Sequence, residues 1–435
     1  MRFCGGGMKE TKKKIHYAWV MALIGGLTMF CMSAQQMSQA VFLPRVAESL
    51  NVGMGPIGIA FSMVTIASLF LTPVFTRLYE KFPARLVTLG AVLGQCVSLI
   101  LVSTARSIYQ VAIAGVFESC TLAGYNNVLT SVIVGRWFKD RGQFAYNVIL
   151  FISMLGGVLF TPIAGAIIAA TSWRTAYLCL LGFLVVVTIP VIRIFFKESP
   201  EKIGLRPYED PNAEKSNAVK TRPVMNAGLT TKQAWRSKDF WLVCIYMIAF
   251  SYPMTMPNHL SAHLESVGYA TAVGVSVATA SMVGGLSGRI VLGYLSERLS
   301  LQTINAIYCG VGILSAIAFC FGGVIGAVGA VVTSFLFGAA VRAAVVQYSM
   351  LRYKVFGASH DYVGISANLA ICAHLVIATS STMYGMIYDA TGSYNGGFIL
   401  VIAMFAIAAL LPFMILRSRK EQSAEANAAQ SVEPT

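Results

Sequence analysis

Residues 197–238 have the sequence KESPEKIGLRPYEDPNAEKSNAVKTRPVMNAGLTTKQAWRSK, a polar stretch that divides an otherwise apolar chain into two halves. Six apolar runs of about twenty residues precede it and six follow it. A run of this length spans the hydrocarbon core of a bilayer when it is α-helical. The sequence therefore predicts an all-α membrane protein with twelve transmembrane helices in two six-helix bundles.

The twelve runs also set the expected domain boundaries. We expect spans at 17–39, 55–76, 86–104, 108–134, 144–170, 176–196, 239–259, 271–294, 303–322, 324–348, 362–388 and 396–416. These boundaries give an N-terminal tail at 1–16, a bundle at 17–196, a central loop at 197–238, a second bundle at 239–416 and a C-terminal tail at 417–435. The first run is long enough to span the bilayer, so we expect a transmembrane helix there rather than a cleaved signal.

Charged residues make up 11% of the chain and apolar residues 56%, whereas a soluble domain carries about 25% charged residues. Of the 32 Lys and Arg residues, 27 fall in the segments on the same side as both termini. An excess of Lys and Arg is typical of the segments on the cytoplasmic side of a membrane. We therefore expect a multi-pass protein of the plasma (inner) membrane with both termini cytoplasmic. Lipid headgroups, and not nucleic acid, are the expected contact of the basic central loop.

The sequence offers no pattern typical of catalysis or metal binding. None of the nine Cys residues forms a C-x-x-C pair, and eight of them lie inside apolar runs. Such residues are expected to pack as small apolar side chains. No nucleophile–base pair, metal-binding cluster or nucleotide-binding loop stands out. We expect a protein that is not an enzyme and has no cofactor or metal.

The two halves repeat one another. Glu48 follows the first run and Glu265 follows the seventh, 217 residues later. Glu80 and Glu297, at the ends of the second and eighth runs, are separated by the same offset. A constant offset predicts two pseudo-symmetric copies of a six-helix unit in the same orientation. Parallel halves with a site between them at the middle of the membrane are one recurrent transporter plan.

The segment Gly293-Tyr294-Leu295-Ser296-Glu297-Arg298 resembles the signature loop of the major facilitator superfamily, with Glu in place of its usual Asp. The first half keeps the charges of this loop, although Thr76 and Pro83 stand where the family has Gly. The resemblance implies that these loops gate the cytoplasmic side, where charge pairs hold one conformation closed. The candidate gating residues are Glu80, Lys81, Arg85, Gly293, Glu297 and Arg298.

Within that superfamily, four stretches resemble the monocarboxylate porters and oxalate:formate antiporters, at 136–142, 198–208, 288–297 and 388–394. The resemblance implies alternating-access transport of a small organic anion, either with a proton or in exchange for a counter-anion. It also implies that Arg289, four residues before the loop Gly, binds the substrate carboxylate. We expect a single chain to be the functional unit.

Two arginines, apart from Arg193 at the end of the sixth run, lie inside predicted spans, where a charge costs about 3 kcal/mol and marks a candidate functional residue. Arg289 is a candidate substrate ligand, and the alternative is an ion pair with an acid of the gating loop. Arg342 has three candidate roles: a second anion-binding group, a partner in an ion pair, or a side chain that snorkels to the cytoplasmic interface.

Glu118 is the one acidic residue deep in a predicted span. A carboxyl group in hydrocarbon favours its neutral form, so Glu118 is a candidate proton carrier. The alternatives are a permanent counter-ion to one of the arginines and a hydrogen-bonded packing residue. His374 is a second candidate for proton coupling and also for substrate binding.

Other features bear on the choice of substrate. No Lys occurs between Val363 and Met386, where dicarboxylate-carrying members of the resembled group have one, so we expect a monocarboxylate rather than oxalate. Asn126 and Tyr252 are further candidate substrate contacts, and each could equally hydrogen-bond a neighbouring helix. An alternative function on the same fold is an exporter of amphipathic drugs or metabolites, for which Arg289 would matter little. A membrane sensor or scaffold would bind a partner and carry no flux.

Overall fold

A computed structural model of the chain describes residues 16–139, 141–209, 230–296, 298–357, 359 and 361–430. The two expected tails and the expected central loop fall partly outside these residues, and Glu297 falls outside them. Short helices at Glu201–Ile203 and at α10 (Thr231–Ala234) lie in the described parts of the central loop.

The N-terminal bundle contains six spans, and two of them are assembled from shorter helical pieces. The first span comprises α1 (Tyr17–Met32), α2 (Ala34–Met37) and α3 (Gln39–Ser49). The second and third are α4 (Met54–Lys81) and α5 (Ala84–Ser103). The fourth comprises α6 (Ile108–Cys120), a π-helical stretch (Thr121–Leu129) and α7 (Thr130–Trp137), and it precedes α8 (Gly142–Ala170) and α9 (Trp173–Phe195).

The C-terminal bundle repeats this plan. Its first span comprises α11 (Lys238–Ser251), a 3₁₀ stretch (Tyr252–His259) and α12 (Leu260–Ser266). The other five spans are α13 (Thr271–Ser296), α14 (Leu301–Cys320), α15 (Gly326–Phe356), α16 (Tyr362–Thr391) and α17 (Asn395–Gln430). Among the described residues, ten helical stretches are long and apolar enough to cross a membrane, and the divided first and fourth spans complete the set. The predicted twelve-helix architecture is confirmed.

The interruptions of the first and seventh spans have a local cause and a common location. Pro253 and Pro257 lie in the 3₁₀ stretch, and a proline there removes an N–H donor from the α-helical ladder. In the first span, the backbone leaves the α-helix at Ser33 and Ser38. Residues beside both interruptions line the cavity between the bundles that is described below. Irregular backbone is tolerated at membrane depth in such a place, because a polar cavity can satisfy its hydrogen bonds.

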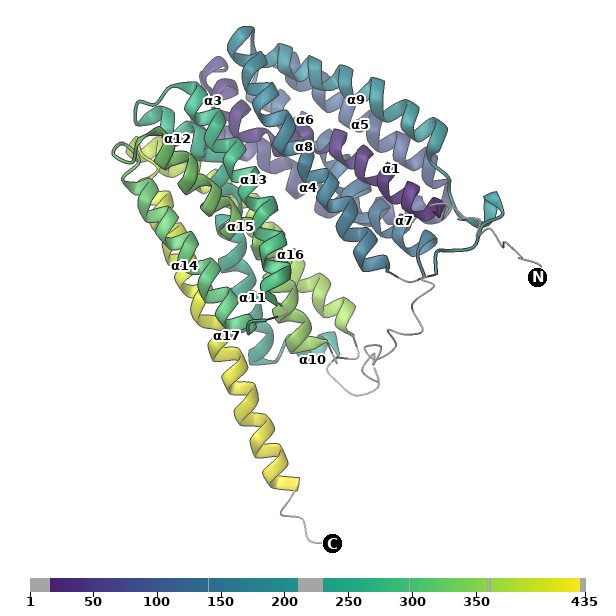
Figure 1. The fold of residues 1–435 in the computed structure, drawn as a ribbon. Coiled ribbons are helices and arrows are strands. Elements are labelled where there is room, and N and C mark those ends of the chain that lie inside the picture. Colours follow the sequence, from purple (N-terminus) through teal and green to yellow (C-terminus); the bar gives the residue numbers. More distant parts are fainter. Residues whose placement is uncertain are drawn as a thin grey trace, which may run out of the picture.

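The two bundles approach one another at the end that carries α3 and α12 and separate toward the end that carries α7 and α10 (Figure 1). We call these the closed end and the open end. Near the closed end α4 packs directly on α16, and a Cβ atom on Gly385 would lie 2.2 Å from the carbonyl oxygen of Met54. Only glycine permits this backbone approach.

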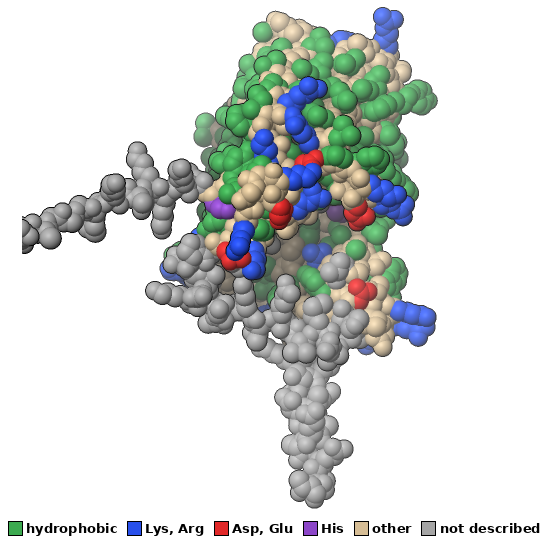
Figure 2. Space-filling model, turned by 90° about the vertical axis from the view of Figure 1, so that its right-hand side faces the viewer, with side chains coloured by type: hydrophobic (Ala, Val, Ile, Leu, Met, Phe, Trp, Pro, Cys, Tyr) green, Lys and Arg blue, Asp and Glu red, His purple; other side chains and the backbone are tan. Residues whose placement is uncertain are grey.

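Large apolar side chains are exposed on the outside of both bundles, among them Phe70, Val186, Leu314 and Val328. Figure 2 shows hydrophobic side chains spread over one such face. Exposure of this kind fits a body whose surrounding solvent is lipid. Aromatic and aliphatic side chains inside each bundle form the packed core.

Candidate functional site

A central cavity of about 200 Å³ lies between the two bundles. It is lined by the first two spans of the N-terminal bundle and by three spans of the C-terminal bundle. Most of its lining side chains are amides and hydroxyls, and Arg342 is the one charged residue among the described lining residues. The lining comprises Gln36, Met37, Gln39, Phe61, Ser62, Thr65, Met254, Thr255, Asn258, Arg342, Ile377 and Ser381.

Arg342 lies in the middle of α15. The helix continues for fourteen residues beyond it, to Phe356, which is about 21 Å. The Arg342 side chain lines the central cavity rather than the exposed end of the helix. The Nε atom is enclosed by protein and has no hydrogen-bond partner among the described residues. Arg342 is therefore a cation held at the central cavity.

Arg289 lies on the adjacent helix α13. Its Nε donates to the backbone carbonyl oxygen of Arg342 at 3.1 Å, and its Nη1 lies 3.0 Å from the sulfur of Met154 on α8 of the other bundle. It lines a second cavity of about 440 Å³ with Tyr146, Asn147, Leu150, Phe151, Met154, Leu286, Ile290, Gly293, Val345, Val346 and Ser349. The alternative pairing of Arg289 with Glu297 concerns a residue outside the described part of the chain.

Glu118 lies inside the N-terminal bundle and is buried. Its Oε2 accepts a hydrogen bond from Gln35 Nε2 at 2.6 Å, while its Oε1 has no partner among the described residues. The chain of side chains continues: Gln95 donates to Gln35 at 2.7 Å, and Thr121 donates to Gln95 at 2.6 Å. Among the described residues, Glu118 forms no ion pair with Arg289 or Arg342. In this conformation it is therefore not the counter-ion of either arginine.

The break in the first span brings the Glu118 network close to the central cavity. Gln35 contacts Glu118, and the next residue, Gln36, lines the cavity. Both residues belong to α2, a single turn that lies between the two interruptions of the span. A change at Glu118 can therefore reach the cavity through one short helical segment.

Three other residues were predicted to contact the substrate. His374 and Tyr252 make other contacts, and the side chain of Asn126 is not described. The Nδ1 atom of His374 hydrogen-bonds the carbonyl oxygen of Ala370 at 2.8 Å, within its own helix, and His374 lines neither of the two cavities. The hydroxyl of Tyr252 points to the sulfur of Met383 at 3.6 Å. The side chain of Asn126 lies outside the described part.

The predicted gating residues occupy the open end. Glu80 and Lys81 are exposed at the end of α4, and Gly293 lines the second cavity. Arg85 donates to the carbonyl oxygen of Arg193, which ties α5 to α9 within one bundle. The guanidinium of Arg298 stacks on the ring of Tyr294 at 4.4 Å. Among the described residues, these side chains form no ion pair between the bundles.

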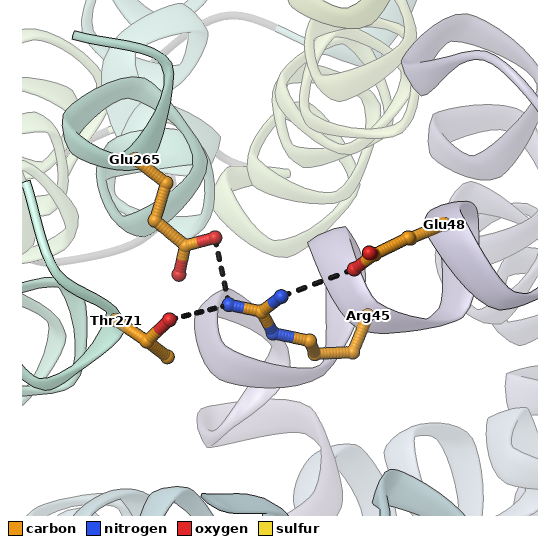
Figure 3. A network of polar contacts seen from close by, with 4 residues as sticks. All are labelled: Arg45, Glu48, Glu265 and Thr271. Atoms are coloured by element: carbon orange, nitrogen blue, oxygen red, sulfur yellow. Dashed lines mark hydrogen bonds and ion pairs between the residues drawn. The ribbon is translucent and has the colours of Figure 1, made fainter. Parts of the chain in front are cut away.

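The closed end carries polar contacts that the sequence did not single out as a gate. Arg45 on α3 donates to Glu265 on α12 at 2.8 Å and to Thr271 on α13 at 2.7 Å (Figure 3). The same guanidinium donates to Glu48 at 3.0 Å. Glu48 and Glu265 occupy equivalent positions in the two halves of the sequence, and this equivalence marked them as related. It did not show that Arg45 would contact both of them.

A second contact at this end joins a carboxylate to a helix terminus. Asp389, near the end of α16, accepts hydrogen bonds from the backbone N–H groups of Met54 and Gly55 at 2.8 and 2.7 Å. These residues begin α4, where the helix dipole favours a negative charge. Arg45 and Asp389 therefore each connect the two bundles at the closed end.

Two six-helix bundles that meet at one end around a polar cavity with a buried cation define a membrane transporter rather than an enzyme. The family model of the Major Facilitator Superfamily matches residues 25–376, and the chain belongs to this superfamily.

The chain resembles individual transporters at low identity. It is 24% identical to the phosphoglycerate transporter protein of Salmonella typhimurium over 277 residues, which are 58% of each chain. It is 25% identical to monocarboxylate transporter 12 of Rattus norvegicus over 320 residues, 67% of this chain and 63% of that protein. The chain thus spans less than two thirds of each relative's length. The crystal structure of the nucleoside transporter NupG superposes with a TM-score of 0.68 at 13% identity, over 92% of this chain and 98% of that one, and it supports the fold alone.

Proposed function

We propose that this protein is a secondary active transporter of a small organic carboxylate and that it works by alternating access. The observation that supports this most is Arg342, a cation at a polar cavity between the bundles with no described acidic partner. An arginine can grip a carboxylate through two parallel hydrogen bonds. Amide and hydroxyl groups around it, such as those of Asn258 and Ser381, can satisfy the remaining oxygens of a small anion.

The names of the two relatives favour an organic anion. Phosphoglycerate and the monocarboxylates both contain a carboxylate group, and the relatives are called transporters of these compounds. The likeness extends over 58% and 67% of this chain. It supports an anionic cargo more than a neutral one.

We assign the open end to the cytoplasm of the plasma membrane, because the basic residues are concentrated in the segments on that side. The conformation is then inward-facing. Arg289 lines the cavity nearer this end, and Arg342 lies deeper, at the central cavity. The loop residues Glu80, Lys81, Arg85, Gly293, Glu297 and Arg298 would close this end in the opposite conformation.

We assign the coupling proton to Glu118. It has an unpartnered carboxylate oxygen in a buried place, and Gln35 and Gln36 connect it to the cavity through α2. Protonation would change the hydrogen bonds that Glu118 can accept, including the one from Gln35. It would thereby alter the position of the short helix α2. A protein that exchanges anions without protons would not need this titration.

The test is uptake of labelled carboxylates by proteoliposomes that contain the full chain. An imposed inward proton gradient tests symport, and vesicles preloaded with an anion test exchange. Saturable uptake that is lost in Arg289→Gln and in Arg342→Gln is expected. If no carboxylate is taken up under either driving condition, or if both variants remain fully active, the proposal is wrong.

An exporter of amphipathic compounds is the second candidate. The lining of the second cavity favours it, because Tyr146, Phe151 and several aliphatic side chains surround Arg289. This function predicts that substitution of these apolar residues abolishes transport, whereas neutralisation of Arg342 has little effect. The same proteoliposomes, assayed with a fluorescent lipophilic compound, distinguish the two functions.

A further inference from the structure

Three buried side chains of the C-terminal bundle have polar atoms that make no hydrogen bond to the described part of the chain. These atoms are Nδ1 of His259, Nδ1 of His263 and the hydroxyl oxygen of Tyr394. Each of the three residues is at most 1% exposed. The rings of His259 and His263 both pack against the ring of Tyr394, with centroids 5.6 and 6.0 Å away. A buried polar atom without a partner is costly, so three of them around one ring indicate a bound molecule that can hydrogen-bond to them.

This cluster is linked to the central cavity by a hydrogen bond. His259 ends the 3₁₀ stretch of the seventh span, His263 lies about one turn further on in α12, and Tyr394 directly precedes α17. The Nε2 atom of His263 bonds the carbonyl oxygen of Phe319 at 2.9 Å. The Nε2 atom of His259 lies 3.0 Å from Oγ of Ser381, which is on α16 and lines the cavity. The cavity therefore contacts the cluster through Ser381.

The bond to Phe319 determines which nitrogen of His263 carries the proton. Among the described residues, neither histidine forms an ion pair, and an unpaired buried charge is costly, so both rings are neutral. A carbonyl oxygen can only accept, so Nε2 of His263 is the donor and its Nδ1 is a lone pair that needs a donor.

The tautomer of His259 decides what Ser381 offers to the cavity. If Nε2 of His259 carries the proton, it donates to Ser381, and the hydroxyl proton of Ser381 is available to the cavity. If Nδ1 carries the proton, the Ser381 hydroxyl must donate to Nε2, and only its lone pairs remain for the cavity. Within the described part of the chain, His259 is the one hydrogen-bond partner of this hydroxyl.

One water molecule matches the three unpartnered atoms in only one of these tautomers. A water molecule can donate to both Nδ1 atoms and accept the hydroxyl proton of Tyr394, which satisfies all three atoms and uses every proton. With the proton on Nδ1 of His259, the same three hydrogen bonds must accommodate four protons, and one proton has no acceptor. The first arrangement is therefore the more stable.

We propose that His259, His263 and Tyr394 bind a buried water molecule that fixes the tautomer of His259. Ser381 then presents its hydroxyl proton to the cavity, where it donates to an oxygen of the transported carboxylate beside Arg342. His259 is a positioning residue, because it acts on the substrate through Ser381. The inference rests on the proposed function and names a specific hydrogen-bond donor for its substrate.

The test measures KM and Vmax for labelled acetate and lactate in proteoliposomes that contain the full chain. Ser381→Ala should raise KM roughly 10- to 100-fold, as expected for loss of a hydrogen bond to a charged group. His259→Leu should raise KM by a similar factor, because the Ser381 hydroxyl then donates to a carbonyl of its own helix. His259→Gln supplies an amide N–H in place of Nε2 and should keep KM within about threefold of wild type.

A double variant distinguishes positioning from a merely structural role. In His259→Leu combined with Ser381→Ala, KM should be no higher than in Ser381→Ala alone, because His259 acts through Ser381. Tyr394→Phe removes the donor to the water and should raise KM roughly 2- to 10-fold. If His259→Leu does not fold, Tyr394→Phe and Ser381→Ala give the same cycle. Tyr246→Phe is the control: it removes a buried hydroxyl of the same bundle that bonds Asn305, and KM should not change.

A crystal structure of the full chain that shows ordered water gives a readout independent of transport. We expect a density peak within hydrogen-bond distance of both Nδ1 of His263 and the hydroxyl of Tyr394, and none at this place in Tyr394→Phe. Clear density for the three side chains without such a peak in wild type would overturn the inference.

Failure of the inference can be told apart from failure of the proposed function. Additive effects in the double variant, or a KM in His259→Gln as high as in His259→Leu, would overturn the role of His259 and leave the carboxylate transporter in place. If wild type takes up no carboxylate under either driving condition, the proposed function fails and the inference fails with it.

Discussion

Arg45 of the N-terminal bundle and Glu265 of the C-terminal bundle form an ion pair across the closed end, with Nη2 2.8 Å from Oε2 (Figure 3). Both side chains are about a quarter exposed or less, so water screens the pair only in part. Glu265 and Thr271 share the same Nη2 atom. Opening of this end must break these contacts, which makes them a determinant of the conformational equilibrium.

Substitution Arg45→Gln should therefore increase the population that is open at this end. The pair is partly exposed, so we expect about 1 kcal/mol, which is about a fivefold change in population. The measurement is the labelling rate of a cysteine introduced at Asn258, which lines the central cavity, by a membrane-impermeant maleimide applied from the closed side. Arg106→Gln, at an exposed arginine of the same end, is the control and should leave the rate unchanged. An equal rate in Arg45→Gln and wild type would contradict the role of the pair.

Asp389→Asn tests the second contact of the closed end. The amide oxygen can still accept from one of the N–H groups of Met54 and Gly55, but the amide NH2 cannot accept from the other, and the charge that favours the helix dipole of α4 is lost. We expect about 1–2 kcal/mol in favour of opening. Asp389→Ala, which also removes the hydrogen bonds, should have a larger effect in the same labelling assay.

A double variant then measures whether the two contacts are independent. In Arg45→Gln combined with Asp389→Asn, the free energy of opening obtained from the labelling rate should change by the sum of the two single effects, within about 0.5 kcal/mol. A large deviation from additivity would show that the two contacts form and break as one unit.

Gly385→Ala should hinder closure between α4 and α16. The added Cβ would lie 2.2 Å from the backbone oxygen of Met54, and backbone atoms cannot move aside as a flexible side chain can. Overpacking of this kind costs about 1–3 kcal/mol. Labelling at the cavity from the closed side should rise and transport should fall. Gly310→Ala is the matched control, because no neighbouring atom lies within 4 Å of a Cβ there.

Glu118→Gln should separate proton-driven uptake from exchange. The glutamine retains an acceptor for Gln35 and removes the titration, so the fold should be preserved. We expect loss of the response to an imposed proton gradient, while exchange between anion-loaded vesicles continues. Full proton-driven uptake in Glu118→Gln would assign the coupling to another group, and loss of both modes would indicate a structural role.

The sequence alone was sufficient for the architecture. Apolar runs of the length of a bilayer, separated by one polar stretch and repeated at an offset of 217 residues, predict two six-helix bundles, because the membrane requires each span to satisfy its own backbone hydrogen bonds. The boundaries were less well predicted. The first span was expected at 17–39, but its helical pieces continue to Ser49, because polar and charged residues such as Arg45 and Glu48 continue the helix at the closed end.

The candidate residues were also identified from the sequence, because an ionisable group inside an apolar run stands out by its cost. Their arrangement was not predictable in this way. Glu118 and Arg342 are both in the middle of spans, yet one lies in a hydrogen-bond network inside the N-terminal bundle and the other lines the cavity. Helical periodicity places a residue on a face, but which face meets the cavity depends on the packing of all the helices around it.

The sequence by itself determined that this chain is a twelve-helix membrane protein and which few residues carry charge within it, since both follow from the free energy of transfer into lipid. The tertiary structure alone decided which of those charges are compensated. Arg45 pairs with Glu265, and Asp389 accepts a hydrogen bond from the start of α4. In both cases the partners belong to different bundles and are more than two hundred residues apart in the chain. The Arg342 side chain occupies the space beside Gly285 and is paired with no described carboxylate. Electrostatic pairing depends on distances of a few ångströms between helices, and only their packing sets those distances.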